Sequence, residues 1–293
     1  MSESSFGSSE KRAPGGPFSA PAWDCGAGLL TPPGRPLVMG ILNLTPDSFH
    51  APSRQPDIAT AVQTAMDMAA AGADLLDLGA ESTRPGAAPV SADEELERLE
   101  PVLAAVRRET DLPLTVDTVR AVTARAALDS GADAINDISG GADPGMFDLA
   151  AAHGCGLILM HMQGTPRTMQ VAPSYHDVVA EVAGWLAARC ALAQEAGIAP
   201  ERLAVDPGIG FGKTLEHNLA LMGNLRDVAK GRPLLLGASR KSFIGQITGA
   251  GTEDRLPGSL AALAAAFHHS ATLVRVHDVA SSVQFLDVLK AMI

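Results

Sequence analysis

Short apolar runs alternate with amphipathic segments along most of the chain. Eight runs are rich in leucine or β-branched residues: Leu37–Leu42, Leu75–Leu78, Leu112–Val116, Ala132–Ile138, Gly156–Met160, Leu203–Val205, Leu234–Leu236 and Thr272–Val276. Segments with a helical period of about 3.6 lie between and after them: Ile58–Ala71, Ser91–Arg108, Val119–Leu128, Met146–Ala152, Tyr175–Ala196, Glu216–Ala229, Gly258–Phe267 and Val279–Met292. Near-continuous apolar runs are typical of parallel strands whose two faces are both covered.

The ends of the helical segments carry their own signals. Ser91 stands three residues before Glu94, a spacing that predicts a capping box. Glycines at positions 72, 131, 154 and 197 predict left-handed helix ends. Eight regular strand–helix units predict an α/β protein with a single (β/α)8 TIM barrel over residues 23–293, after a flexible tail over residues 1–22. A doubly wound sheet is the alternative, although it seldom forms from eight such units.

Charge and composition narrow the possible partners. The chain has 293 residues, with 33 Asp and Glu against 22 Lys and Arg, and only 4% of its residues are aromatic. An acidic chain with few aromatic residues is a poor partner for nucleic acid or for an anionic membrane. The three cysteines lie far apart without a C-x-x-C pair, which predicts reduced thiols in a cytoplasmic protein. We expect neither a secretory signal nor a membrane-spanning helix.

The residues at the strand ends are the candidates for chemistry, because a TIM barrel carries its active site on the face where its strands end. They are Asn43, Asp77, Glu81–Arg84, Asp117, Asn136, Asp137, Met160–Met162, Asp206, Ser239–Lys241 and Arg275–Asp278. Acidic and amide side chains on one side, with Arg, Lys and His on the other, predict a particular kind of ligand. It would carry a hydrogen-bonding heterocycle at one end and an anionic group at the other.

Two subsets of these residues suggest specific contacts. A carboxylate accepts two hydrogen bonds in one plane, so Asp117 and Asp206 suit the guanidine-like edge of a pterin or guanine. Asn136 can read an adjacent ring nitrogen and amine, because its amide both donates and accepts. The candidates for the anionic group come from the first and last strands, which are neighbours in a closed barrel: Asn43, Arg275 and His277.

Other patterns resemble sites only in part. Gly208–Thr214 ends like a P-loop, but Pro207 occupies the position of the first required glycine. We therefore interpret this segment as a flexible glycine loop at the barrel mouth. The histidines, including His161 and His277, form no zinc-ligand pattern, and we expect them to be hydrogen-bonded. The sequence has no G-x-S-x-G nucleophile elbow.

Seven motifs resemble, in order, those of bacterial dihydropteroate synthases: Met39–Phe49, Glu81–Gly86, Asn136–Ser139, Leu159–Gly164, Asp206–Lys213, Ser239–Ser242 and Arg275–Asp278. The resemblance runs from about Leu37 to the C-terminus. It implies a cytoplasmic TIM-barrel transferase of folate biosynthesis. Such an enzyme joins 6-hydroxymethyl-7,8-dihydropterin diphosphate to 4-aminobenzoate and releases diphosphate. The resemblance also implies Mg²⁺ as a cofactor, a homodimer and inhibition by sulfonamides.

The same resemblance implies a role for each matching residue. The residues implied to contact the pterin are Asp117, Asn136, Met160, Asp206, Phe211, Gly237 and Lys241, and Ser239 is implied to bind substrate. Asn43, Arg275 and His277 are implied to bind the diphosphate, and Asn43 is also implied to bind Mg²⁺. Phe49, Pro85 and Ser242 are implied to shape the aminobenzoate pocket. Thr83 and Arg84 are implied to lie in a mobile loop that binds substrate. The implied catalytic residues are Asp117, Asp206, Lys241, Arg275 and His277. They would stabilise the cation formed when the C–O bond to diphosphate breaks, together with the departing diphosphate.

One segment departs from the family pattern. Residues 50–53 read His-Ala-Pro-Ser, where the family has Ser-Asp-Gly-Gly, and we expect Pro52 to stiffen this loop. The altered loop leaves open a non-catalytic pterin-binding paralogue. A pterin-dependent methyltransferase is a second alternative, although it would not be expected to carry both Glu81–Gly86 and Ser239–Ser242.

Overall fold

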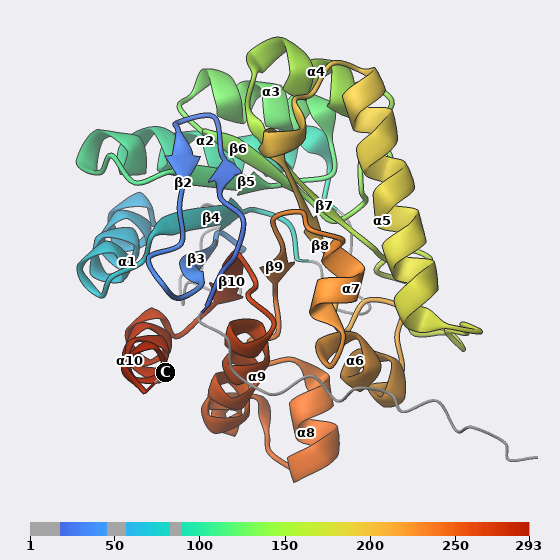
Figure 1. The fold of residues 1–293 in the computed structure, drawn as a ribbon. Helices are drawn as coiled ribbons and strands as arrows, with labels where there is room; N and C mark the ends of the chain where they lie inside the picture. The colour runs from blue at the N-terminus through green and yellow to red at the C-terminus, as the bar shows by residue number, and fades with distance from the viewer. Residues whose placement is uncertain (1–17, 46–56, 83–89, 293) are drawn as a thin grey trace, which may run out of the picture.

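Eight parallel strands form a barrel in the computed structural model, which describes residues 18–45, 57–82 and 90–292. Their order is β8-β7-β6-β5-β4-β3-β10-β9, and a parallel bridge between Val205 and Leu234 joins the two outer strands (Figure 1). The strands are β3 (Leu37–Asn43), β4 (Leu75–Gly79), β5 (Leu114–Asp117), β6 (Ala134–Asp137), β7 (Gly156–Met160), β8 (Leu203–Asp206), β9 (Leu235–Leu236) and β10 (Leu273–Val276). All eight predicted strands are confirmed, with ends that differ from the predicted ones by at most two residues.

Helices surround the barrel, as the alternating pattern predicts (Figure 1). They are α1 (Ile58–Ala70), α2 (Ala92–Glu109), α3 (Ala121–Asp129), α4 (Met146–His153), α5 (Val178–Glu195), α6 (Leu215–Met222), α7 (Leu225–Ala229), α8 (Ser242–Thr248), α9 (Leu256–His268) and α10 (Val279–Ala291), with the 3-10 helices η2 (Pro200–Arg202) and η3 (Thr252–Asp254). The prediction of one helix over Glu216–Ala229 is wrong, because Gly223 ends α6 and the chain restarts as α7. The sequence pattern does not predict α8.

The predicted helix ends are confirmed in most details. The side chain of Ser91 accepts a hydrogen bond from the Glu94 backbone at 3.1 Å, which caps α2. The carboxylate of Glu94 instead binds Arg98, so only half of the predicted capping box is seen. The glycines at positions 72, 131, 154 and 197 all have positive φ, in agreement with left-handed ends.

A hairpin closes the N-terminal end of the barrel, which the sequence pattern does not predict. Its strands are β1 (Trp23–Asp24) and β2 (Leu29–Leu30), drawn in blue in Figure 1. Trp23 is fully buried in a cluster of side chains from the barrel interior: Leu37, Met39, Leu75, Ala134, Ile158, Ala204, Leu235 and Leu273. Residues 18–22, which the sequence assigns to the tail, also contact the barrel, since the Phe18 ring lies 5.2 Å from that of Phe267.

The common direction of the strands fixes where a site can form. Their C-terminal ends meet at one mouth of the barrel, whereas the hairpin covers the other end. A second, larger hydrophobic core fills the space between the strands and the helices and holds the strands in place. None of the helices in the described part of the chain is long and apolar enough to cross a bilayer.

Candidate active site

One arginine links two aspartates at the mouth of the barrel. Arg275 of β10 donates from Nε to Oδ2 of Asp77 at 2.5 Å and from Nη2 to Oδ2 of Asp117 at 2.8 Å. Asp77 belongs to β4 and Asp117 ends β5. The structure therefore brings together two of the predicted site residues, Asp117 and Arg275, and adds Asp77 to them.

Asp77 is the main site residue to which the sequence assigned no role. Its side chain is fully buried, and it also accepts hydrogen bonds from the Thr115 hydroxyl and, at 3.2 Å, from Nδ2 of Asn136. A charged residue inside the otherwise apolar strand β4 was the signal that could have identified it. Asp77 orients Arg275 and Asn136, two residues that are both expected to bind substrate.

Burial and the neighbouring charges shift the pKa values of Asp117 and Arg275. It raises the pKa of Asp117 to about 7, although the neighbouring Arg275 opposes the shift. Burial also disfavours the Arg275 cation, but Asp77 and Asp117 outweigh this effect and raise the pKa of Arg275 above its ordinary value. The mouth thus holds a permanent cation beside a carboxyl group that titrates near neutral pH.

A second group of predicted residues gathers at the ends of β8 and β9. A Cβ atom at Gly237 would lie 3.7 Å from Oδ2 of Asp206 and 3.8 Å from Nζ of Lys241, so these side chains flank the glycine. Lys241 binds the carbonyl of Ile209, and its Nζ lies 4.5 Å from the centre of the Phe211 ring. Burial raises the pKa of Asp206 against the opposing charge of Lys241, and it lowers the pKa of Lys241 to about 8.

Hydrogen bonds hold the backbone of the loop after β8, which the sequence pattern predicts to be a flexible glycine loop. Its glycines at positions 208, 210 and 212 have positive φ, and a Cβ atom at Gly208 would overlap the carbonyl oxygen of His161. Four successive carbonyls accept hydrogen bonds from side chains, three of them from outside the loop: Ile209 from Lys241, Gly210 from Gln170, Phe211 from Lys213 and Gly212 from Tyr175. These bonds hold Phe211 beside Asp206 and Lys241.

The residues predicted for the anionic group lie around β10. Nδ1 of His277 lies 3.0 Å from the Ser239 hydroxyl, as expected for a hydrogen-bonded histidine. Asn43 ends β3, the neighbour of β10 in the sheet. Arg240 turns away from this group, with its guanidinium bound to Asp278 at 2.6 and 2.9 Å.

The remaining predicted residues occupy different positions. Met160 is buried at the end of β7, and Asn136 is buried one residue before the end of β6. Ser242 is exposed at the start of α8, directly after Lys241. Four predicted residues lie outside the described part of the chain, as do residues 50–53: Phe49, Thr83, Arg84 and Pro85.

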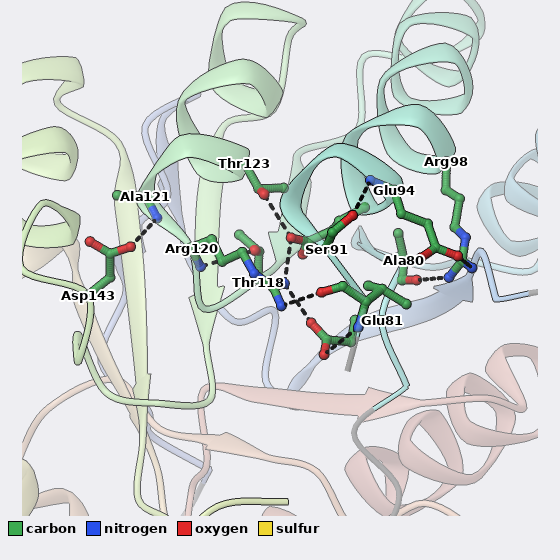
Figure 2. A network of polar contacts seen from close by, with 12 residues as sticks. Ala80, Glu81, Ser91, Glu94, Arg98, Thr118, Arg120, Ala121, Thr123 and Asp143 are labelled. Carbon is green, nitrogen blue, oxygen red and sulfur yellow. Dashed lines mark hydrogen bonds and ion pairs between the residues drawn. The ribbon is translucent and has the colours of Figure 1, made fainter. Parts of the chain in front are cut away.

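A network around Arg120 joins the ends of β4 and β5 to the helices behind them (Figure 2). Nη1 of Arg120 lies 2.6 Å from Glu81 and 2.8 Å from Glu95, and Nη2 donates to the carbonyl of Val90 at 2.7 Å. Burial disfavours the Arg120 cation, but the two glutamates raise its pKa above the ordinary value. Glu95 is almost fully buried and also accepts from Thr123. The network therefore anchors Glu81 and Val90, on either side of residues 83–89.

Comparisons with known proteins agree with this geometry. Residues 39–277 match the family described as "Pterin binding enzyme". The chain is 46% identical to the dihydropteroate synthase of Escherichia coli K12 over 87% of its own length and 91% of that protein. The chain therefore belongs to the dihydropteroate synthase family of pterin-binding enzymes.

Solved structures support the same assignment. The Xanthomonas albilineans dihydropteroate synthase with 4-aminobenzoic acid matches with a TM-score of 0.86 at 44% identity, over 94% of this chain and 98% of that one. The Burkholderia cenocepacia dihydropteroate synthase complexed with 7,8-dihydropteroate matches with a TM-score of 0.84 at 45% identity, over 93% and 96%. The predicted TIM-barrel transferase is thereby confirmed.

Proposed function

We propose that this chain condenses 6-hydroxymethyl-7,8-dihydropterin diphosphate with 4-aminobenzoate to give 7,8-dihydropteroate and diphosphate. The observation that carries the proposal is the arrangement of Asp117, Asp206 and Arg275 at one barrel mouth, in a chain that belongs to the dihydropteroate synthase family. The carboxylates suit a pterin edge, and the arginine suits an anionic leaving group.

The pterin would bind between the two carboxylates. Oδ1 of Asp206 accepts from the Gly208 backbone at 2.7 Å, which fixes the plane in which the carboxylate meets the ligand. The bond from Nδ2 of Asn136 to Asp77 orients the Asn136 amide so that its oxygen can accept from a ring amine. Phe211 and Lys241 form one wall of this slot, where the glycine at 237 leaves room for the ring.

The reaction needs no nucleophile from the protein. The C–O bond to diphosphate breaks at a carbon attached to the electron-rich dihydropterin, and the positive charge spreads into the ring. Asp117 and Asp206 stabilise this charge, while Arg275 and His277 stabilise the departing diphosphate. The amine of 4-aminobenzoate then attacks the carbon and loses a proton. Exclusion of water matters at this stage, because water would convert the cation to the alcohol.

Magnesium is part of the proposal, and Asn43 is the residue that would bind it. Among the described residues, no group of three or more His, Cys, Asp and Glu side chains could hold a metal ion. Mg²⁺ often binds through one or two protein oxygens together with substrate phosphates and water, so the Asn43 amide oxygen beside a diphosphate fits this mode. When bound there, the ion would neutralise charge on the leaving group. Asn43→Ala should raise the Mg²⁺ concentration needed for half-maximal activity.

The decisive experiment measures diphosphate release by the purified chain with Mg²⁺ and the dihydropterin diphosphate, with and without 4-aminobenzoate. We expect release that depends on 4-aminobenzoate, with dihydropteroate as the product. Tight pterin binding without condensation would instead favour a non-catalytic paralogue. Asp206→Asn is the matched control, because it keeps the shape of the side chain and removes its charge.

Three finer features of the proposal follow from family membership. The chain would work in the cytoplasm, as a homodimer, and sulfonamides would compete with 4-aminobenzoate for its site. Sedimentation velocity measures the oligomeric state directly. Competitive inhibition by a sulfonamide, relieved by added 4-aminobenzoate, would place the drug in the aminobenzoate pocket.

A further inference from the structure

Lys213 is a buried cation to which the proposed reaction gives no role. Only 3% of its surface is exposed, and its Nζ lies within hydrogen-bond distance of three acceptors. They are Nδ1 of His161 at 3.0 Å, the carbonyl oxygen of His161 at 3.2 Å and the carbonyl oxygen of Phe211 at 2.9 Å. An ammonium group has three N–H donors, so this arrangement uses all of them. The lysine that gives Gly208–Thr214 its likeness to a P-loop therefore binds protein acceptors.

These bonds tie the end of β7 to the loop after β8. When Lys213 is an ammonium group, it can only donate, so Nδ1 of His161 accepts from it, the ring proton lies on Nε2 and the imidazole is neutral. Burial and the charge of Lys213 lower the pKa of His161 to about 3, which agrees with a neutral ring. The ring packs edge-on against Trp185, with 5.0 Å between the ring centres. His161 thus acts as a fixed acceptor for Lys213.

The same bonds hold one wall of the proposed pterin slot. The backbone of Phe211 is fixed by Lys213, while its ring lies under Nζ of Lys241. Loss of the Lys213 ammonium would leave two carbonyls and one imidazole nitrogen without their buried donor, which is costly inside a protein. The wall would then relax away from the ligand.

Lys213 also contributes charge to the site. The charged and titratable groups that interact with it are Asp206 at the end of β8, Lys241 before α8 and His161 after β7, and the ring of Tyr175, before α5, lies 6.1 Å from that of His161. Burial lowers the pKa of Lys213 to about 7, while the Asp206 carboxylate favours its charged form. In return, Lys213 is one of the cations that oppose the rise in the pKa of Asp206 caused by burial.

We propose that Lys213 is a positioning residue of the pterin site, which fixes the backbone of Phe211 and adds a positive charge that acts on the Asp206 carboxylate. This inference rests on the proposed function, because it assigns the role through pterin binding. Lys213 acts through Phe211 and Asp206, and it does not contact the reacting atoms.

The test is calorimetric titration with 6-hydroxymethylpterin, which lacks a leaving group, at pH values from about 5.5 to about 8.5. Lys213→Met should weaken binding about 10-fold or more, because buried acceptors lose their donor. It should also move the acid limb of the binding profile to higher pH, since Asp206 would protonate more readily. Tyr175→Phe removes a neighbouring loop hydrogen bond without changing charge, so it should leave the limb in place. Lys290→Met, on the exposed end of α10, should bind like the wild type.

The outcomes separate this inference from the proposed function. Unchanged affinity and an unchanged acid limb in Lys213→Met would overturn the positioning role while the proposed function stands. Wild-type affinity in Asp206→Asn would overturn the proposed pterin site, and the inference with it.

A measurement on the wild-type chain covers the case in which Lys213→Met does not fold. In a chain labelled with ¹⁵N-histidine, NMR should show His161 as the neutral Nε2–H tautomer down to about pH 5. A proton on Nδ1, or titration near the ordinary histidine pKa of about 6.5, would overturn the inference.

Discussion

Arg275 and Asp77 meet across the barrel mouth although β3 lies between their strands in the sheet. The arginine binds a carboxylate two strands away that has no exposed surface. The ion pair therefore holds the guanidinium of Arg275 in one orientation before an anionic group binds. A fixed cation of this kind loses little freedom when a leaving group departs toward it.

Removal of the Asp77 carboxylate should reduce both stability and activity. Asp77→Ala leaves Arg275, Thr115 and Asn136 without their shared acceptor, and breaking a buried ion pair costs about 3 kcal/mol. Urea denaturation checks this value, and kcat/KM for the pterin diphosphate should fall as Arg275 loses its orientation. Thr115→Val removes one donor and should cost only about 1 kcal/mol. Equal stability of Asp77→Ala and the wild type would contradict the role given to this ion pair.

Acidification should reduce pterin use through Asp117. Its carboxyl must be ionised to accept two hydrogen bonds from the pterin edge, and burial raises its pKa to about 7. We therefore expect kcat/KM for the pterin diphosphate to fall as the pH drops through about 7. Asp117→Asn should have low activity and lack this contribution to the profile. Asp227→Asn, an exposed change on α7, should keep the wild-type profile.

The contribution of Asp117 to the free energy of unfolding should change with pH in the opposite direction to its contribution to kcat/KM. Its pKa in the folded chain lies above the value of 3.8 for a free aspartate, so the folded state binds more protons between these pH values. This carboxyl therefore lowers the free energy of unfolding as the pH rises from about 4 to about 7. The slope should be weaker in Asp117→Asn than in the wild type. An unchanged slope would show that Asp117 ionises normally in the folded chain.

Two glycines with similar backbone angles should respond very differently to alanine. Gly208 and Gly249 have φ of +67° and +76°, so each substitution carries the strain of a left-handed alanine, about 1 kcal/mol. At Gly208 the new methyl group would also overlap the His161 carbonyl, whereas at Gly249 no atom lies within 4 Å. Gly208→Ala should therefore cost at least about 3 kcal/mol and weaken pterin binding. Similar thermal stability of the two variants would contradict the close approach of the loop to β7.

The sequence predicts the barrel well because each strand is a local apolar run with a polar residue at its end. Parallel topology then requires the strand ends to meet, so Asp117, Asp206 and Arg275 could be assigned to one mouth without coordinates. The hydrogen-bond partners of the site residues cannot be predicted in this way. Lys213 and Asp77 bind groups that are distant along the chain, at His161 and Arg275, and no spacing rule connects them. The hydrogen bonds of the glycine loop are hard to predict for the same reason, because three of the four side chains that form them come from outside the loop.

The hairpin plug is the clearest case of a non-local feature and gives the last prediction. Trp23 is fully buried among side chains inside the barrel, and its Nε1 donates to the carbonyl of Arg202 at 2.9 Å. Trp23→Ala should lower the free energy of unfolding by about 4 kcal/mol, because it opens a cavity at the closed end. Trp23→Phe keeps part of the volume and loses the hydrogen bond, so its effect should be smaller. Leu29→Ala, at an exposed position of the same hairpin, should change stability by less than about 0.5 kcal/mol. Pterin affinity should be preserved in all three folded variants, since the plug and the mouth lie at opposite ends of the barrel. A selective loss of affinity in Trp23→Phe would show that the two ends are coupled.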